Sequence, residues 1–243
     1  MALSGTIINS ILIIAGTVLG LLFKKLMPER LKSTLLQAVG LIVIFIGIGG
    51  AMSASLTFLD GAFGTKDTLN MIISMVVGTI IGELINIEKR LDAFGAFCQR
   101  KFVKGNGNST FAEGMVTASL IFVVGAMAVV GSLDNGIRGD NSTLVAKGVI
   151  DGITSMVLSS TLGIGVMFSA IPVFIYQGAI SLLGVYIEPY LTTAVISQMS
   201  FTGSILIFAI GFNMLSTIKI KVGNMLPAIF MPILFDVITK LFG

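Results

Sequence analysis

Long apolar runs separated by short polar segments repeat along almost the whole chain. A helix that crosses a hydrocarbon core of about 30 Å needs roughly 20 apolar residues, and eight runs come close to this length. They cover residues 4–23, 34–56, 68–87, 114–133, 143–160, 163–186, 191–215 and 222–242. The runs lack the alternation of apolar and polar residues typical of membrane β-barrels. The pattern therefore predicts an all-α, polytopic helical membrane protein with about eight transmembrane helices, forming a single transmembrane domain over residues 1–243.

The composition strengthens this interpretation. Hydrophobic residues make up 55% of the 243 residues, charged residues only 11%, and the mean hydropathy is +1.02. Water-soluble domains carry about 25% charged residues, so we expect a lipid bilayer around this chain. Cys98 is the only cysteine and histidine is absent, which excludes an internal disulfide and a histidine-ligated metal site. No segment has the strand and Lys-Ser/Thr context of a phosphate-binding loop, so no cofactor is expected.

Lysine and arginine residues are distributed unevenly between the two ends of the runs. With eight crossings, eleven of the fifteen fall on one side, three fall on the other (Lys66, Arg138 and Lys240), and Lys147 lies inside a run. The majority side carries Lys24, Lys25, Arg30, Lys32, Lys89, Arg90, Arg100, Lys101, Lys104, Lys219 and Lys221. Cytoplasmic loops are enriched in such residues, so both termini are predicted outside. This distribution explains the sequence pI near 9.1 without a nucleic-acid partner.

One uncharged stretch is too long for a single crossing. Residues 152–187 contain no charged side chain, and as one straight helix they would measure about 54 Å at 1.5 Å per residue. Tilt cannot accommodate such a length. We therefore expect a tight turn or a broken, re-entrant region between Ser159 and Gly165.

Two glycine-rich segments hint at internal repetition. "AGTVLG" ends the first run and "VGTIIG" ends the third, which favours duplicated hairpins over residues 4–56 and 68–133, although short matches of this kind also arise from composition. Pairs of small residues four apart let membrane helices approach closely. The pairs here are Gly16 with Gly20 and Gly78 with Gly82. Such faces are used inside one bundle or in a homodimer, and both alternatives stay open.

The segment "AKGVIDGITS" (146–155) places two charged residues inside an apolar run. Charge at bilayer depth costs about 2.5–3.5 kcal/mol on insertion scales, so Lys147 and Asp151 should face a partner or a wet cavity. Thr154 and Ser155 continue the same polar stripe at helical spacing. A structural ion pair is the simplest explanation. However, desolvation can cost more than the attraction returns, which favours a role in binding, coupling or gating.

Further polar groups follow in the next run. Gln177 is an expensive amide that either bonds between helices or lines a cavity, and Tyr176 precedes it. The predicted site for a substrate or ion comprises Lys147, Asp151, Thr154, Ser155, Tyr176 and Gln177.

The polar segment "SLDNGIRGDN" (132–141) comes directly before the polar stripe, on the predicted outer side. Its candidate vestibule residues are Asp134, Asn135, Arg138 and Asp140. The alternative is a solvated turn, which its content of Gly, Asn and Asp also favours.

Five segments together resemble a known family. They are "SGTIINSILIIAGTVLGLLFKK", "GTIIGELINIEKRL", "FAEGMVTASLIFVVGAMAVVGSLDNGIRGD", "AKGVIDGITSMVLSSTLGIGVMFSAIPVFIYQGAISLL" and "KIKVGNMLPAIF". They are similar to the bacterial multi-pass membrane proteins of domain-of-unknown-function family 554, the YqgA/YdfK type, nearly from end to end. The resemblance implies a protein of the bacterial cytoplasmic (inner) membrane and a transport role without a defined substrate.

These observations lead to one functional hypothesis and two alternatives. The hypothesis is a secondary transporter of a small ion or polar solute, in which Asp151 binds or exchanges a cation or proton and Lys147 compensates its charge. A channel could use the same polar stripe as its pore lining. A membrane scaffold could instead use the basic segment "EKRLDAFGAFCQRKFVKG" as an interaction surface. An enzyme is not expected, because no nucleophile stands beside a convincing base.

Overall fold

The structure is a computed structural model that describes residues 3–26, 28–59, 61–90, 93, 97, 110–124 and 126–242. The chain divides into two compact units, where the sequence predicts a single domain. Unit 1 contains residues 1–39, 89–123 and 127–187, and unit 2 contains residues 40–88, 124–126 and 188–243. Each unit is therefore assembled from segments that are distant in the sequence.

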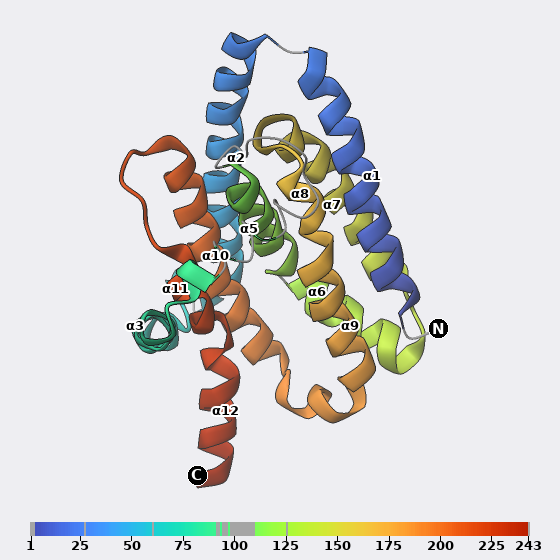
Figure 1. Ribbon diagram of the computed structural model, residues 1–243. Helices are drawn as coiled ribbons and strands as arrows, with labels where there is room; N and C mark the ends of the chain where they lie inside the picture. Colours follow the sequence, from blue (N-terminus) through green and yellow to red (C-terminus); the bar gives the residue numbers. More distant parts are fainter. Residues whose placement is uncertain are drawn as a thin grey trace. The chain divides into compact units, whose positions relative to one another are not determined.

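Unit 1 is built around the pairing of its first helix with a helix from the middle of the chain. Its elements are α1 (Ser4–Leu26), α5 (Thr110–Val123), α6 (Ala126–Leu133), the π-helical turn η1 (Asp134–Arg138), α7 (Ser142–Leu162), α8 (Gly165–Phe168) and α9 (Ala170–Ile187). α1 packs along α7, and α5 contacts α7, α8 and α9 (Figure 1). Gly5 lies against Leu144 and Gly20 against Met156, so α1 and α7 run parallel.

Unit 2 contains two helices and a hairpin from the first half of the chain, together with the C-terminal region. Its elements are α2 (Glu29–Ser55) from residue 40 onward, β1 (Leu56–Leu59), β2 (Ala62–Thr65), α3 (Thr68–Ile85), the 3-10 turn η2 (Glu188–Tyr190), α10 (Thr193–Leu215), α11 (Val222–Met225), the 3-10 segment η3 (Leu226–Phe230) and α12 (Met231–Phe242). α3 packs against α11 and η3, and α10 against η3 and α12.

The helices bury small and polar residues and expose large apolar ones. In α1 the buried positions recur every three or four residues: Thr6, Asn9, Ile13, Gly16, Thr17 and Gly20. The exposed face of the same helix carries Ile7, Ile11, Ile14, Val18 and Leu22. Soluble proteins show the opposite pattern, whereas membrane helices pack through small residues and present apolar ones to lipid. The chain is thus an all-α polytopic membrane protein, as the sequence predicts.

The number of crossings differs from the number predicted from the apolar runs. Six helical segments are long and apolar enough to span a membrane: Ser4–Lys24, Gln37–Ser55, Thr68–Ile85, Gly165–Tyr190, Thr193–Leu215 and Val222–Lys240. A seventh span results if Phe111–Val123 and Met127–Arg138, which meet at a bend of 62°, are taken together. The sequence predicts one unbroken run there. α7 is not among these spans, because Lys147 and Asp151 lower its hydropathy. The predicted count of eight is therefore not confirmed.

The expected interruption between Ser159 and Gly165 is present as a tight turn. α7 ends at Leu162, and Gly163 follows with φ +81°, a conformation that side chains rarely tolerate. The chain then turns back through α8 into α9 (Figure 1). Pro172 lies in the first turn of α9, where its missing N–H breaks no helical hydrogen bond.

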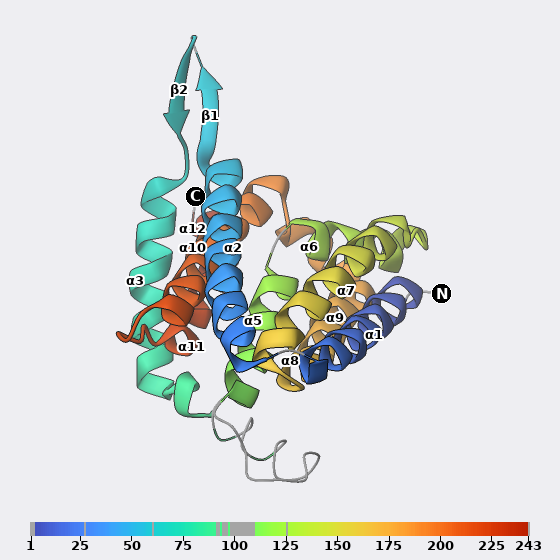
Figure 2. The same ribbon diagram turned by 90° about the horizontal axis from the view of Figure 1, so that it is seen from above.

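A short β-hairpin at the end of α2 interrupts the helical architecture (Figure 2). β1 and β2 pair antiparallel, with Phe58 opposite Phe63 and their ring centroids 5.1 Å apart. Gly61 in the connection has φ +78°. The sequence "LTFLDGAFGT" contains a signal for a hairpin turn, namely an Asp-Gly pair between apolar residues. Because it directly follows an apolar run, this segment resembles the end of a transmembrane helix.

The four predicted packing glycines lie at close helix contacts. A Cβ on Gly16 would lie 1.9 Å from the Gly152 carbonyl oxygen, and one on Gly82 would lie 1.9 Å from the Asn224 carbonyl oxygen. Gly20 and Gly78 are equally tight, against the Met156 carbonyl and the Ala228 backbone. The two similar motifs thus make similar contacts in different units.

Internal duplication stays a prediction. Each of the two predicted repeats is divided between the two units. The hairpin 4–56 contributes α1 to unit 1 and most of α2 to unit 2, and the hairpin 68–133 is divided in the reverse sense. A further match follows in the second half of the chain. Residues 165–171 and 223–229 share the pattern Gly-x-Met-x-x-Ala-Ile. The first follows the turn after α7, and the second follows the turn after α10.

Replacing Gly16 with alanine should destabilise the protein, because α1 must move away from α7 to admit the Cβ. Overpacking of this kind costs about 1–3 kcal/mol. On α2, a Cβ added to Gly49 would have no atom within 4 Å, so Gly49→Ala is the matched control and should be neutral or slightly stabilising. Thermal ramps of detergent-purified protein, followed by size-exclusion chromatography, measure both effects. Equal melting temperatures would contradict the packing role of Gly16.

Candidate functional site

A buried ion pair lies inside unit 1. The Lys147 ammonium donates to an Asp151 carboxylate oxygen at 2.5 Å, one helical turn along α7. Only 8% and 6% of the two side chains are exposed. Two opposite charges withdrawn from solvent gain their mutual attraction but lose hydration, so such a pair adds little stability compared with apolar residues. A pair maintained in this position needs an explanation other than stability.

Glycines on α7 bring the backbone of α1 to the ion pair. A Cβ on Gly148 would lie 3.0 Å from the Asn9 Cα, and one on Gly152 would lie 3.0 Å from the Leu12 carbonyl oxygen. Since Gly148 follows Lys147 and Gly152 follows Asp151, the two backbones lie close together beside the charges. This places the polar side chain of Asn9 at the pair.

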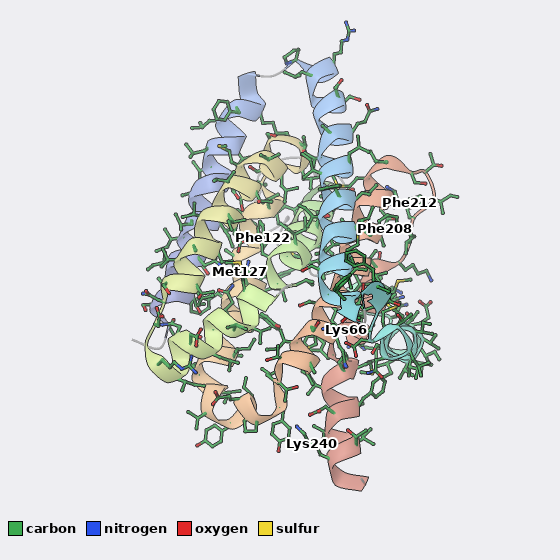
Figure 3. The ribbon with its side chains drawn as sticks, turned by 180° about the vertical axis from the view of Figure 1, so that it is seen from behind. Lys66, Phe122, Met127, Phe208, Phe212 and Lys240 are labelled. Carbon is green, nitrogen blue, oxygen red and sulfur yellow. The ribbon has the colours of Figure 1, made fainter. Side chains whose placement is uncertain are left out.

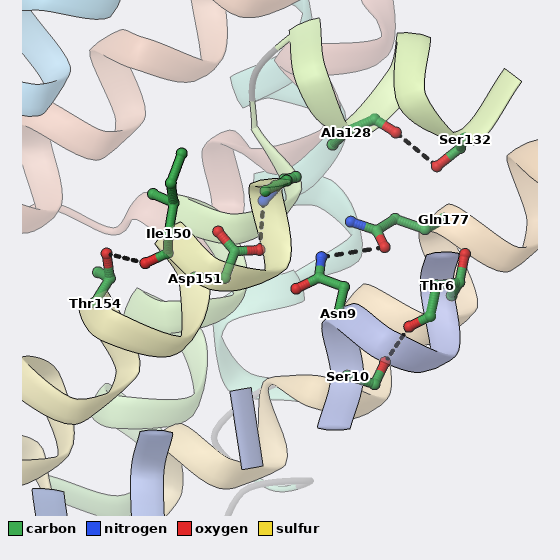
Figure 4. A network of polar contacts seen from close by, with 10 residues as sticks. Thr6, Asn9, Ser10, Ala128, Ser132, Ile150, Asp151, Thr154 and Gln177 are labelled. Carbon is green, nitrogen blue, oxygen red and sulfur yellow. Dashed lines mark hydrogen bonds and ion pairs between the residues drawn. The ribbon is translucent and has the colours of Figure 1, made fainter. Parts of the chain in front are cut away.

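Two buried amides extend the polar group toward α9. The Asn9 amide donates to the Gln177 carbonyl oxygen at 3.2 Å, and both side chains are fully buried. Figure 4 shows Asn9 between Asp151 and Gln177, and the Asn9 amide also interacts with the Asp151 carboxylate. The cluster of Asn9, Lys147, Asp151 and Gln177, here called the polar core, therefore joins α1, α7 and α9.

An aromatic ring provides the second neighbour of the lysine. The Lys147 ammonium lies 5.8 Å from the centre of the Phe122 ring on α5. Phe122 itself is fully buried (Figure 3). A cation within about 6 Å of an aromatic face is attracted by it, so the ring favours a charged ammonium at this place.

Several buried polar atoms around the polar core have no hydrogen-bond partner among the described residues. They are Thr6 Oγ1, Asn9 Oδ1, Ser155 Oγ and Gln177 Nε2. Each residue is fully buried, and an unpaired polar atom in such surroundings costs about 1–3 kcal/mol. Buried groups of this kind typically bind ordered water or a bound ion or ligand.

Polar contacts also fasten α1 at both ends. Near its start, the Gly5 N–H donates to the Asn135 side-chain oxygen at 3.0 Å, and Asn141 donates to the Ser4 hydroxyl at 3.1 Å. Near its end, the Lys24 ammonium donates to the Thr161 carbonyl at 3.1 Å, which places a cation at the C-terminus of α7, where the helix dipole favours it.

The structure brings together some of the predicted site residues and separates others. Lys147, Asp151 and Gln177 belong to the polar core, and Ser155 is buried one turn beyond Asp151. Thr154 is half-buried, and its hydroxyl donates back to the Ile150 carbonyl of its own helix. Helical spacing predicts Thr154 on the same polar stripe as Asp151, but its side chain does not lie on the buried face of α7. Tyr176 is half-buried, and no hydrogen bond joins it to the polar core within the described segments.

The predicted vestibule residues have different environments. Asp134 and Arg138 form an ion pair at 2.7 Å with the arginine 70% exposed, and Asp140 is exposed. The Ser142 N–H donates to Asp140 at 2.9 Å and holds the pKa of that carboxyl below its usual range. Asn135 instead is fully buried and binds α1. A buried Asn135 fits a structural brace better than a solvated mouth.

Neither Asn9 nor Phe122 is among the residues that the sequence predicts for the site. Asn9 lies in the apolar run "IINSILIIAG". An amide there needs hydrogen-bond partners as much as Gln177 does, so the sequence contains a signal for Asn9. Phe122 carries no such signal among 17 phenylalanines. Only its position over Lys147 distinguishes it.

A second polar cluster lies in unit 2, at the end of α3. Asn224 donates to Glu83 at 2.5 Å, and the Glu88 N–H donates to the Asn224 side-chain oxygen at 2.7 Å. Gly223 donates to Glu88, and Lys221 pairs with Glu83 at 2.9 Å. These groups satisfy one another near the exposed end of the unit and connect α3 to α11. Within the described residues, no group of three His, Cys, Asp or Glu side chains could hold a metal ion.

Comparison with known proteins identifies relatives of the whole chain. Residues 4–237 match the family described as "Protein of unknown function (DUF554)". The chain belongs to the DUF554 family. Its similarity to "Uncharacterized membrane protein YdfK" of Bacillus subtilis (strain 168) is 33% identity over 239 residues, or 98% of both chains. "Uncharacterized protein YqgA" of Escherichia coli (strain K12) is 28% identical over 228 residues, covering 93% of this chain and 92% of that protein.

No solved structure matches this DUF554 chain at a significant level. The family match nevertheless spans both units, including the polar core. Together with the apolar exposed faces of the helices, the membrane relative from B. subtilis supports a membrane location.

Removing one partner of the buried ion pair should destabilise this DUF554 protein more than removing both. Lys147→Met or Asp151→Leu alone leaves an uncompensated buried charge, at a cost of about 3–5 kcal/mol, whereas the double variant leaves none. Unfolding in mixed micelles measures the four proteins of this cycle. The exposed pair of Asp134 and Arg138 has the same spacing, so Asp134→Asn is the control and should change stability by less than about 1 kcal/mol. Strictly additive effects of Lys147→Met and Asp151→Leu would argue against the pair.

Proposed function

We propose that this DUF554 protein is a secondary transporter of a small ion or polar solute in the bacterial cytoplasmic membrane, with both termini outside. The observation that carries the proposal is the buried ion pair of Lys147 and Asp151 together with the unpaired polar atoms beside it. A purely structural lock would gain little from such a pair. Ionisable residues at membrane depth generally mark ion or substrate pathways.

The surroundings of the polar core also support a transport role. Three helices meet there, and one of them, α7, ends at a tight turn from which the chain reverses through α8 and α9. Binding sites of secondary transporters typically lie where interrupted helices expose polar groups near the membrane midplane. Asp151 would bind or exchange the cation or proton, and Lys147 would compensate its charge.

The alternatives lead to different observations. A channel would use the same polar core and would give current steps in a planar bilayer. A scaffold would use the basic segment 88–105, most of which lies outside the described residues. Neither alternative accounts for unpaired amide atoms beside a buried ion pair as directly as a binding site does.

Flux into proteoliposomes should depend on the polar core and not on the exposed ion pair. The probes are sodium, potassium, protons, chloride, glycine and glutamate, each applied as a concentration jump with solid-supported-membrane recording. We expect a saturable signal for at least one probe in the wild type and none in the folded Lys147→Met/Asp151→Leu variant. The control is Glu83→Gln/Lys221→Gln, which removes the exposed ion pair of unit 2 and should retain the wild-type signal. A double variant that responds to every probe as the wild type does would overturn the proposal.

A further inference from the structure

The spacing between α1 and α7 limits what can reach Asp151. A methyl group at Gly16 would overlap the Gly152 carbonyl oxygen, and one at Gly148 would be 3.0 Å from the Asn9 Cα. These contacts lie on both sides of Asp151 along α7. No solute fits along this contact while the helices stay packed. A species that reaches the carboxylate from α1 must be passed between hydrogen-bonding groups.

The unpaired atoms of the polar core are suited to a proton relay through hydroxyl and water, in which the amides of Asn9 and Gln177 orient water and do not themselves take up or release the proton. The hydroxyl of Ser155 both donates and accepts hydrogen bonds. The bond between Asn9 and Gln177 leaves one amide oxygen and one NH₂ group unpaired. Exchanging the oxygen and nitrogen positions of both amides, which have nearly the same shape, would again leave one acceptor and one donor. The polar core therefore offers both types of group next to Asp151.

The charges around Asp151 disfavour a metal cation. The Lys147 ammonium already lies 2.5 Å from the carboxylate, and a second cation at this distance would be repelled. Hard cations such as magnesium and calcium also take six or more oxygen ligands, whereas one of the unpaired groups here is the Gln177 NH₂, a donor. A proton needs only one carboxylate oxygen.

Few other ionisable side chains are available on the elements packed against α7. α1 has none before Lys24, which binds the opposite end of α7. α5 carries only Glu113, and α8 carries none. α9 adds Tyr176 and Tyr186. Asp151 is thus the one carboxyl group in the polar core.

We infer that Asp151 is a proton-exchanging carboxyl group, that Lys147 is its internal counter-cation, and that Asn9, Gln177 and Ser155 connect it to water. The proton binds a carboxylate oxygen of Asp151, which becomes neutral, and the Lys147 ammonium keeps the Phe122 ring as its neighbour. The same proton leaves by the reverse step. This inference deepens the proposed function and rests on it for its meaning in transport, because it names the proton as the coupling ion.

Infrared difference spectroscopy of the reconstituted full chain tests the inference without a known substrate. Spectra are recorded between alkaline and acidic buffer. A protonated-carboxyl band should appear on acidification, shift in D₂O, and be lost in Asp151→Asn. Glu83→Gln, which removes an exposed carboxyl group of unit 2, should retain the band. Identical pH-difference spectra for the wild type and Asp151→Asn would overturn the inference.

A second variant keeps the test valid if Asp151→Asn folds poorly. Lys147→Gln retains Asp151 and removes the counter-cation, so the band should appear at more alkaline pH than in the wild type. Ser155→Ala should leave the band in place but slow its appearance after a pH jump. A Lys147→Gln spectrum that titrates as the wild type does would contradict the role of Lys147. A carboxylate band that responds to sodium in place of potassium at constant pH would overturn the assignment to protons.

The outcomes separate this inference from the proposed function. Sodium-driven flux without the Asp151 band would leave the transporter proposal intact and remove the proton assignment. An Asp151 band in a protein whose flux does not depend on the polar core would support proton exchange at Asp151 and overturn the transporter proposal.

Discussion

The contact between the backbones of α1 and α7 is the constraint on which the rest of unit 1 depends. At Gly16 and Gly152 the helices approach so closely that a single methyl group cannot be added. This approach is available only to residues without a side chain, and it brings Asn9 to the level of Lys147 and Asp151. The polar core exists because two helices far apart in sequence pack by their glycine faces. Larger residues there would separate the helices and expose the ion pair to lipid.

A membrane environment explains why polar groups gather inside. Lipid solvates the apolar face of a spanning helix such as α1 but offers no hydrogen bonds, so polar side chains must find partners within the protein. Ser159 of α7, whose hydroxyl donates to the Thr17 carbonyl at 3.2 Å, and Ser181 of α9, which donates to the Ser132 carbonyl at 2.9 Å, do this. Thr6, Asn9, Ser155 and Gln177 retain unpaired atoms. Ser74 of unit 2 has an unpaired hydroxyl as well, but no buried ion pair accompanies it among the described residues. The combination of unpaired atoms with a buried ion pair distinguishes the polar core.

The distribution of the chain over two units gives the glycine motifs a common meaning. Gly16 and Gly20 join the first helix to α7, and Gly78 and Gly82 join α3 to α11 and η3. In both cases a helix from the first half of the chain packs on a segment from the second half. Unit 2, however, places no ion pair like that of Lys147 and Asp151 inside its described helices. If the two units share an origin, the buried pair of Lys147 and Asp151 is a feature that distinguishes unit 1 from unit 2.

The sequence by itself determined the membrane class, the family resemblance, the interruption near Gly163 and the need of Lys147 and Asp151 for a partner. These follow from local properties, because apolar length, glycine conformation and the cost of buried charge do not require knowledge of distant neighbours. Tertiary structure alone decided that Asn9 and Phe122 lie beside the ion pair, that the Thr154 hydroxyl donates back to its own helix, and that Asn135 braces α1. Each of these outcomes depends on which helix packs beside which, and helical periodicity fixes the direction of a side chain without naming its neighbour.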